Sequence, residues 1–277
     1  MWKMKTFYIE KLDKHRFNLY KMKIEKDNFK IYANLEKERN IIKVIKKLIK
    51  NGTTNVVLSK ELCENRDLIN AINSSGIDIF DGRWLEKYLV FEILDYVIKQ
   101  IGLKKEEIEF AITTNEITDI SIEIIRTLAT QYRRLTVVTN HIEKFKKIEK
   151  QILEKEGIML VISNNRRKSL LKSKIILNID FPTELINKYQ IYEEAIIVNL
   201  KGNVKIEKKR FNGININDYE ICFKYEDEFD FEKKEKYNKK DIYEAKIIKK
   251  QPNKFIMKRI DEDQVKIIEL VGNKSTI

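Results

Sequence analysis

The sequence predicts an α/β protein with parallel sheets, and two observations predict this class. Short apolar runs of strand length alternate with amphipathic stretches of helix length from about residue 29 to residue 202. The connections between them are short, and most of the strand-like runs are continuously apolar, as in a sheet that is covered on both faces. We expect a small N-terminal α/β domain, a long connecting helix, a second parallel-sheet domain and a mixed C-terminal extension.

The first domain is predicted at residues 1–83. Its pattern predicts strands at 29–35, 54–59 and 77–82 and helices at 38–52 and 64–76. In the first of these helices Ile41, Ile45 and Leu48 share one face, and Gly52 is expected to end it. The alternating segment before residue 29 is expected to add a hairpin or edge strands.

A long helix is predicted at residues 84–102, with Asp81 as its cap. The helix is apolar around much of its circumference, so we expect it to pack against both domains and to connect the first to the second. Its charged residues, Glu86, Lys87, Glu92, Asp95 and Lys99, argue against a membrane span.

The second domain is predicted at residues 103–202. Its expected strands lie at 107–114, 135–140, 158–163, 174–180 and 195–200, and its expected helices at 117–133, 142–157 and 165–173. Residues 203–277 do not continue this alternation of strands and helices, and they are expected to form a C-terminal extension that packs on the rest of the protein. The sequence pattern of the extension does not predict a particular fold.

The composition indicates a protein that folds around a core of its own. The chain has 277 residues, 43% of them hydrophobic, and its net charge of +12 is spread along the sequence instead of being concentrated in one segment. Cys63 and Cys222 lie far apart and the N-terminus does not resemble a signal peptide, so we expect a reducing, cytoplasmic location. With two histidines and no cysteine pair at ligand spacing, no metal site is expected.

The stretch EFAITTNEITD, residues 109–119, is the junction of the first strand and helix of the second domain. In dinucleotide-binding folds this turn is rich in glycine, which lets backbone N–H groups approach a pyrophosphate. Here no glycine occurs between Gly102 and Gly157. Thr113, Thr114 and Asn115 could donate hydrogen bonds to a phosphate, but the interpretation we favour is a helix cap by Thr114 or Asn115, with Glu116 in the first turn.

Two later strand ends carry further polar residues. LTVVTNHIEKFKK supplies Thr139 and Asn140 followed by a lysine-rich helix, and KIILNIDFP supplies Asn178 and Asp180 before a proline. Together with the order of domains, residues 84–202 resemble the dinucleotide-binding Rossmann domain of the shikimate dehydrogenase and glutamyl-tRNA reductase type, without its glycine-rich loop. The resemblance implies NAD(P) as the cofactor, with these candidate cofactor-binding residues: Thr113, Thr114, Asn115, Thr139, Asn140 and Asp180.

The same resemblance provides two candidate catalytic residues. Lys60 follows a predicted strand, as does a lysine of shikimate dehydrogenases, but the Asn-Val-Thr-x-Pro-x-Lys spacing is not met. Cys63 in LCENR is similar to the nucleophile of glutamyl-tRNA reductases, with Glu64 inserted before Asn65 and Arg66. A cysteine near a helix start is more often a small core residue than a nucleophile.

Two basic triplets are the best candidates for an anionic partner. They are Arg166, Arg167 and Lys168, and Lys208, Lys209 and Arg210.

Three hypotheses follow. We favour a non-catalytic structural or regulatory module that binds either no cofactor or NAD(P), with a nucleotide, a small anion or a protein as its partner. The first alternative is an NAD(P)-dependent oxidoreductase with an atypical phosphate-binding turn, using Lys60. The second is a nucleic-acid-associated protein that uses the two basic triplets.

Overall fold

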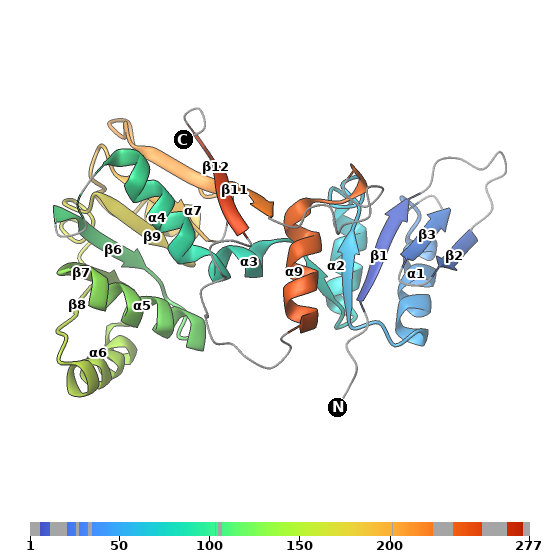
Figure 1. Cartoon of the computed structure of the whole chain (residues 1–277), viewed down its shortest axis with the longest axis horizontal. Helices are drawn as coiled ribbons and strands as arrows, with labels where there is room; N and C mark the ends of the chain where they lie inside the picture. Colours follow the sequence, from blue (N-terminus) through green and yellow to red (C-terminus); the bar gives the residue numbers. More distant parts are fainter. Residues whose placement is uncertain are drawn as a thin grey trace. The chain divides into compact units, whose positions relative to one another are not determined.

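The computed structural model describes residues 6–11, 21–25, 28–32, 35–102, 104, 107–200, 202–223, 235–250 and 265–273. The chain forms two compact units (Figure 1). The first unit comprises Met1–Leu85 and Tyr225–Lys254, and the second comprises Glu86–Lys224 and Phe255–Ile277. Each unit is therefore built from two separate stretches of sequence, and the residues after 203 are shared between them.

The first unit contains a five-stranded sheet in the order β2-β3-β1-β4-β5. Its strands are β1 (Thr6–Lys11), β2 (Lys21–Glu25), β3 (Asn28–Tyr32), β4 (Asn55–Leu58) and β5 (Asp78–Phe80). The predicted hairpin is confirmed, since β2 and β3 are antiparallel neighbours. The expectation of edge strands is wrong for β1, which pairs in parallel with both β3 and β4. Both faces of β1 are buried, with Phe7 and Ile9 on one side and Tyr8 on the other, as a central strand requires.

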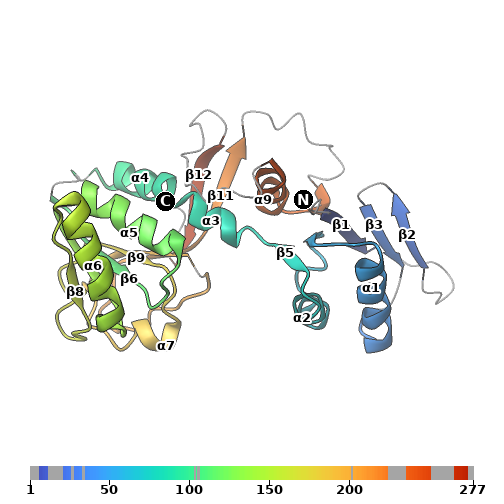
Figure 2. The same cartoon turned by 90° about the horizontal axis from the view of Figure 1, so that it is seen from below.

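Helices cover both faces of this sheet. Helices α1 (Glu38–Lys50) and α2 (Arg66–Ser74) bury one face around Ile9, Val56 and Leu58. On the opposite face lies α9 (Lys239–Lys250), which the chain contributes much later in the sequence (Figure 2). Asn65 caps α2 by accepting a hydrogen bond from the Leu68 N–H at 2.9 Å.

The second unit contains a seven-stranded sheet in the order β12-β11-β10-β9-β6-β7-β8. The strands are β6 (Glu109–Thr113), β7 (Arg134–Val138), β8 (Val161–Ser163), β9 (Ile175–Asn178), β10 (Ile196–Asn199), β11 (Ile214–Phe223) and β12 (Val265–Gly272). All neighbours are parallel except β12, which runs antiparallel to β11 at one edge. Each of the five strands predicted in this domain corresponds to one of these.

The helices of the second unit are α4 (Val90–Ile101), α5 (Asp119–Gln131), α6 (Ile142–Glu156) and the single turn α7 (Thr183–Ile186), while α3 (Arg83–Tyr88) spans the junction of the two units. The helix expected at 84–102 is therefore two helices, separated at Leu89. Among the helices of the described ranges, none combines the length and the apolar composition that crossing a membrane requires.

The predicted helix at 165–173 is wrong, because these residues form turns. The Asn165 side chain accepts hydrogen bonds from the N–H groups of Arg167 and Lys168, which holds a tight turn. Leu170 then pairs with Ile191 in an isolated bridge, and its carbonyl accepts from the Tyr192 N–H at 3.1 Å. The segment thus bonds to a neighbouring segment as well as within its own turns, and its internal hydrogen bonds do not continue as a regular helix.

Similar non-helical connections cover one face of the inner strands of the sheet. Three connecting segments, at 164–174, 181–195 and 202–213, contribute Leu170, Tyr189 and Val204 to a core on the sheet residues Ala111 and Ile197. Helices α4 and α5 lie on the opposite side (Figure 2). The face opposite α4 and α5 is therefore covered by connections that are largely non-helical, with α7 as a single helical turn.

Candidate functional site at the carboxyl edge of the second sheet

The turn between β6 and α5 has its backbone N–H groups bound by a side chain of the protein itself. The Asp180 carboxylate, at the end of β9, accepts from the Asn115 N–H at 2.8 and 2.9 Å and from the Glu116 N–H at 2.6 Å. The Thr114 hydroxyl lies 3.4 Å from the same carboxylate. Asp180 is 6% exposed. The Asp180 carboxylate thus binds the backbone N–H groups that this turn could otherwise offer to an external anion.

Asn115 connects this turn to the end of β7. Its side-chain oxygen accepts from the Asn140 N–H at 2.9 Å and from the Thr139 hydroxyl at 3.3 Å. The structure therefore joins five of the six residues predicted to bind a cofactor through one set of hydrogen bonds: Thr114, Asn115, Thr139, Asn140 and Asp180. The sixth, Thr113, precedes Thr114 in the chain, and its hydroxyl donates to Asn178 instead. Their role toward a cofactor stays a prediction.

The helix cap lies further along than predicted. Thr118, not Thr114 or Asn115, is the N-cap of α5, and its hydroxyl accepts from the Ser121 N–H while the Ser121 hydroxyl accepts from the Thr118 N–H. Because a separate capping box serves the first turn of the helix, the N–H groups of Asn115 and Glu116 remain for Asp180.

A row of buried amides continues along the edge. The Thr113 hydroxyl donates to Asn178 at 2.7 Å, and the Asn178 amide donates to Asn199 at 2.8 Å. The Asn199 amide in turn donates to the Asn215 side chain at 2.8 Å. Thr113, Asn178 and Asn199 are fully buried, and each makes hydrogen bonds within the row. In a parallel sheet this edge is where ligands bind, and here the chain's own polar groups fill it from β6 to β11.

Sequence reasoning missed Asn199 and Asn215, although a signal was present. Three successive strands, IILN, IIVN and ININ, carry asparagine after or among β-branched residues. Asparagine is depleted in strands, so its recurrence in three neighbouring strands indicates a hydrogen-bonded row.

The outer part of the edge carries a second group, in which the buried Tyr189 lies beside the exposed residues Asn140 and Arg166. The Tyr189 hydroxyl lies 3.4 Å from the Asn140 side-chain oxygen. Burial raises the pKa of Tyr189, and the positive charge of Arg166 opposes this shift, so the guanidinium lies near the phenol. The backbone explains the proximity, since the Gln190 N–H donates to the Arg166 carbonyl at 2.7 Å.

Both basic triplets are hydrogen-bonded to the same short stretch of chain, from Asn187 to Gln190. Arg166, in the first triplet, is bonded to Gln190. The second triplet is anchored to Asn187, because the Lys208 ammonium donates to the Asn187 carbonyl and the Glu207 N–H donates to the Asn187 side chain at 2.8 Å. Five of the six cations are exposed, namely Arg166, Arg167, Lys168, Lys209 and Arg210, and Lys208 is half-buried.

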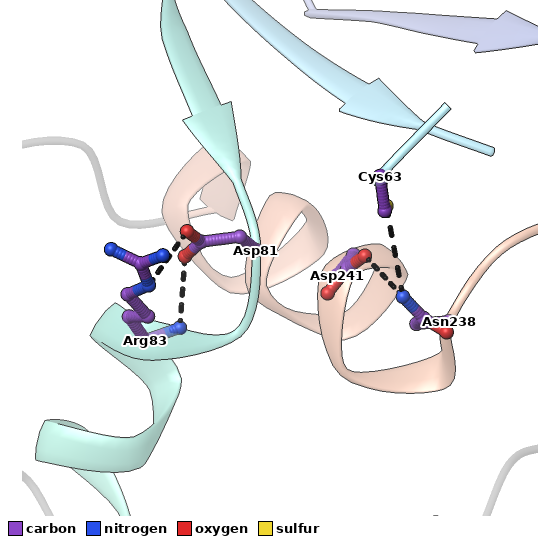
Figure 3. A network of polar contacts seen from close by, with 5 residues as sticks. All are labelled: Cys63, Asp81, Arg83, Asn238 and Asp241. Atoms are coloured by element: carbon purple, nitrogen blue, oxygen red, sulfur yellow. Dashed lines mark hydrogen bonds and ion pairs between the residues drawn. The ribbon is translucent and has the colours of Figure 1, made fainter. Parts of the chain in front are cut away.

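The candidate catalytic residues, Lys60 and Cys63, belong to the first unit and lie in the connection after β4. Lys60 is exposed, and its backbone N–H donates to the Lys236 carbonyl at 2.9 Å. Cys63 is half-buried and its sulfur lies 4.0 Å from the Asn238 amide, which also donates to Asp241 at 3.0 Å (Figure 3).

The surroundings of Cys63 disfavour a nucleophile. Burial and the negative charges of Asp241, Asp81 and Glu64 raise the pKa of the Cys63 thiol to about 11. A reactive cysteine needs the opposite environment, in which positive charge stabilises the thiolate. Within the described ranges, no three His, Cys, Asp or Glu side chains are grouped so as to hold a metal ion.

The strand order decides the fold of the second unit. Counted from β6 to β11 as strands one to six, the parallel strands stand in the order 3-2-1-4-5-6, which is the order of the dinucleotide-binding doubly wound sheet. The second unit has a Rossmann-like fold. It departs from that fold in the missing glycine loop, in the largely non-helical connections of its second half and in the antiparallel strand β12.

Comparison with known proteins gives similarity to solved structures alone. No protein family matches the sequence, and no curated protein matches it. L-tryptophan dehydrogenase from Nostoc punctiforme is similar with a TM-score of 0.36 and 11% identity over 66% of this chain and 53% of that one. Shikimate 5-dehydrogenase from Listeria monocytogenes, solved in complex with shikimate and NAD, is similar with a TM-score of 0.28 and 12% identity over 62% of this chain and 68% of that one.

Ornithine transcarbamoylase from Giardia lamblia is similar with a TM-score of 0.31 and 10% identity over 71% of this chain and 72% of that one. The chain spans about half the length of the tryptophan dehydrogenase. At scores and identities this low, we base the Rossmann-like assignment on the strand order and not on these similarities.

Proposed function

We propose that this protein is a non-catalytic structural or regulatory module whose Rossmann-like domain is closed to dinucleotides in their usual pose. One observation carries the proposal: the Asp180 carboxylate accepts the N–H groups of Asn115 and Glu116. In dinucleotide-binding relatives the N–H groups of this turn bind the pyrophosphate. Here a pyrophosphate would have to displace a bound carboxylate and then lie beside its negative charge.

Further features support the proposal. The row of buried amides leaves Thr113, Asn178 and Asn199 with hydrogen-bond partners inside the protein. The Cys63 thiol is held in its neutral form at ordinary pH by its surroundings. A cytoplasmic location is part of the proposal, and the wide separation of Cys63 and Cys222 in the sequence supports it.

Titration with NAD⁺, NADH, NADP⁺ and NADPH, followed by calorimetry, tests the proposal. We expect no saturable binding by the wild-type protein up to about 1 mM, the upper end of ordinary enzyme substrate affinities. Saturable binding together with hydride transfer to a keto acid, lost on Lys60→Ala, would establish the oxidoreductase alternative instead. The matched control is Lys37→Ala, an exposed lysine of the same unit outside the proposed site.

A second candidate function is the binding of a nucleic-acid backbone, and a specific observation favours it. The two basic triplets, about forty residues apart in sequence, are both hydrogen-bonded to the short stretch from Asn187 to Gln190. Clustered Lys and Arg side chains neutralise phosphates and release counterions, which gives affinity that falls steeply with salt.

Fluorescence anisotropy with a labelled oligonucleotide of about 20 nucleotides, measured over a range of salt concentrations, tests this candidate. Arg166→Glu with Arg167→Glu is expected to weaken binding and to reduce the salt slope by roughly one for each cation removed. Lys150→Glu with Lys155→Glu, an equal change of charge on α6, is expected to leave binding nearly unchanged. Absence of binding at low salt, or equal loss in both double variants, removes this candidate.

A further inference from the structure

Helix α9 covers an apolar face of the first unit's sheet. Tyr8, Val57 and Phe80, from β1, β4 and β5, form this face and pack against residues of the stretch 235–250. Tyr237, Ile242 and Ala245 supply the covering side chains, and the rings of Tyr8 and Tyr237 meet edge to face with centroids 5.5 Å apart. Release of this stretch would expose a continuous apolar surface.

The covering helix carries a carboxyl group in an unfavourable place. Glu244 is 3% exposed, and its Oε2 atom has no hydrogen-bond partner in the described part of the chain. The backbone N–H groups of Leu85 and Gly82 donate to the Glu244 carboxyl group. A charged carboxylate with an unpaired oxygen is costly to bury, whereas burying a neutral carboxylic acid costs much less.

The charged groups around Glu244 add to that cost. Asp81, in the connection after β5, and Asp241, one turn earlier on α9, both act on Glu244 with negative charge. Asp81 is neutralised in part by Arg83, whose Nε atom lies 3.0 Å away (Figure 3). Lys240 lies over Gly82, but among the groups that shift Glu244 no cation appears.

The balance of these effects raises the pKa of Glu244 to about 8. Burial raises it most, and the negative charges of Asp81 and Asp241 raise it further. The backbone hydrogen bonds from Leu85 and Gly82 lower it in part. At neutral pH the docked helix therefore holds a proton that the released helix would lose.

We propose that α9 is a proton-dependent strap, which stays on the β1-β4-β5 face while Glu244 is neutral and is released when this side chain ionises. The sign follows from linkage. The pKa of Glu244 is higher in the docked state than in the released state, so docking is strongest in acid and weakens as the pH rises toward about 8. Above that value both states are ionised and the dependence levels off. The strap lies in the first unit and is independent of the proposal made for Asp180.

Hydrogen exchange of the full-length protein across this pH range tests the proposal, with intrinsic exchange rates taken into account. We expect the protection of α9 amides to fall at least roughly tenfold between about pH 6 and about pH 8. The amides of α1, on the opposite face of the same sheet, report on unfolding of the whole unit and are expected to change little.

Three variants separate the causes. Glu244→Gln keeps the shape without a titrating proton, so α9 protection is expected to become independent of pH. Asp241→Asn removes one neighbouring negative charge, and the pH dependence is expected to level off at a lower pH. Glu61→Gln, an exposed change in the same unit, is expected to behave as wild type.

Wild-type α9 protection that is flat across the range would overturn the proposal, as would an unchanged pH dependence in Glu244→Gln. If Glu244→Gln does not fold, the wild-type profile and the Asp241→Asn shift decide the question.

Discussion

Replacing Asp180 with alanine removes the acceptor of three donors at once. The lost hydrogen bonds are those from the N–H groups of Asn115 and Glu116, at 2.6 to 2.9 Å, and the longer contact from the Thr114 hydroxyl. Hydrogen bonds to a charged group contribute about 1.5 to 3 kcal/mol each. Because Asn115 is half-buried and Glu116 is exposed, water can replace part of this.

We therefore expect Asp180→Ala to lower the free energy of unfolding by about 3 kcal/mol. Asp180→Asn retains one carbonyl acceptor and is expected to cost roughly half as much. Urea unfolding followed by circular dichroism measures both values. A loss below about 1 kcal/mol for Asp180→Ala, the size of one ordinary hydrogen bond, would refute the reasoning.

The same variant tests whether the turn can receive an external anion. With the carboxylate gone, the N–H groups of Asn115 and Glu116 are open to inorganic phosphate, which would stabilise the folded state by mass action. Phosphate is expected to raise the melting temperature of Asp180→Ala above the effect of sodium chloride at equal ionic strength, and not to do so for wild type. An equal response of both proteins would show that Asp180 does not occupy an anion site.

Two further predictions concern packing and reactivity. Gly213→Ala would place its Cβ 2.0 Å from a backbone oxygen at the start of β10, so we expect a loss of about 3 kcal/mol or more in urea unfolding. Gly52→Ala, at φ +66° but in open space, is the control and is expected to cost about 1 kcal/mol. Alkylation at about pH 8, followed by mass spectrometry, is expected to label the exposed Cys222 well before Cys63. The reason is that a Cys63 pKa of about 11, in place of 9.0, lowers the thiolate fraction of this residue roughly a hundredfold. Equal labelling rates of the two cysteines would contradict this account of Cys63.

The sequence by itself determined the α/β class, the five strands of the second domain and the absence of a glycine-rich turn after β6. These are local properties, because the continuous apolar runs of buried strands and the periodicity of helices are written along the chain. The strand ends at Thr113, Asn140 and Asp180 were also singled out from the sequence, through the resemblance of residues 84–202 to a dinucleotide-binding Rossmann domain.

Tertiary structure alone decided which partners these residues have. Asp180 meets the N–H groups of Asn115 because β9 pairs with β6, and no local pattern records that pairing. The segment 165–173 has helix-forming composition, yet it forms turns because its bonds to the stretch after Tyr189 compete successfully with helical ones. Likewise, residues 235–250 cover one face of the first unit's sheet, and only long-range packing decides that they do so. Hydrophobic burial depends on which surfaces meet and not on their distance along the chain.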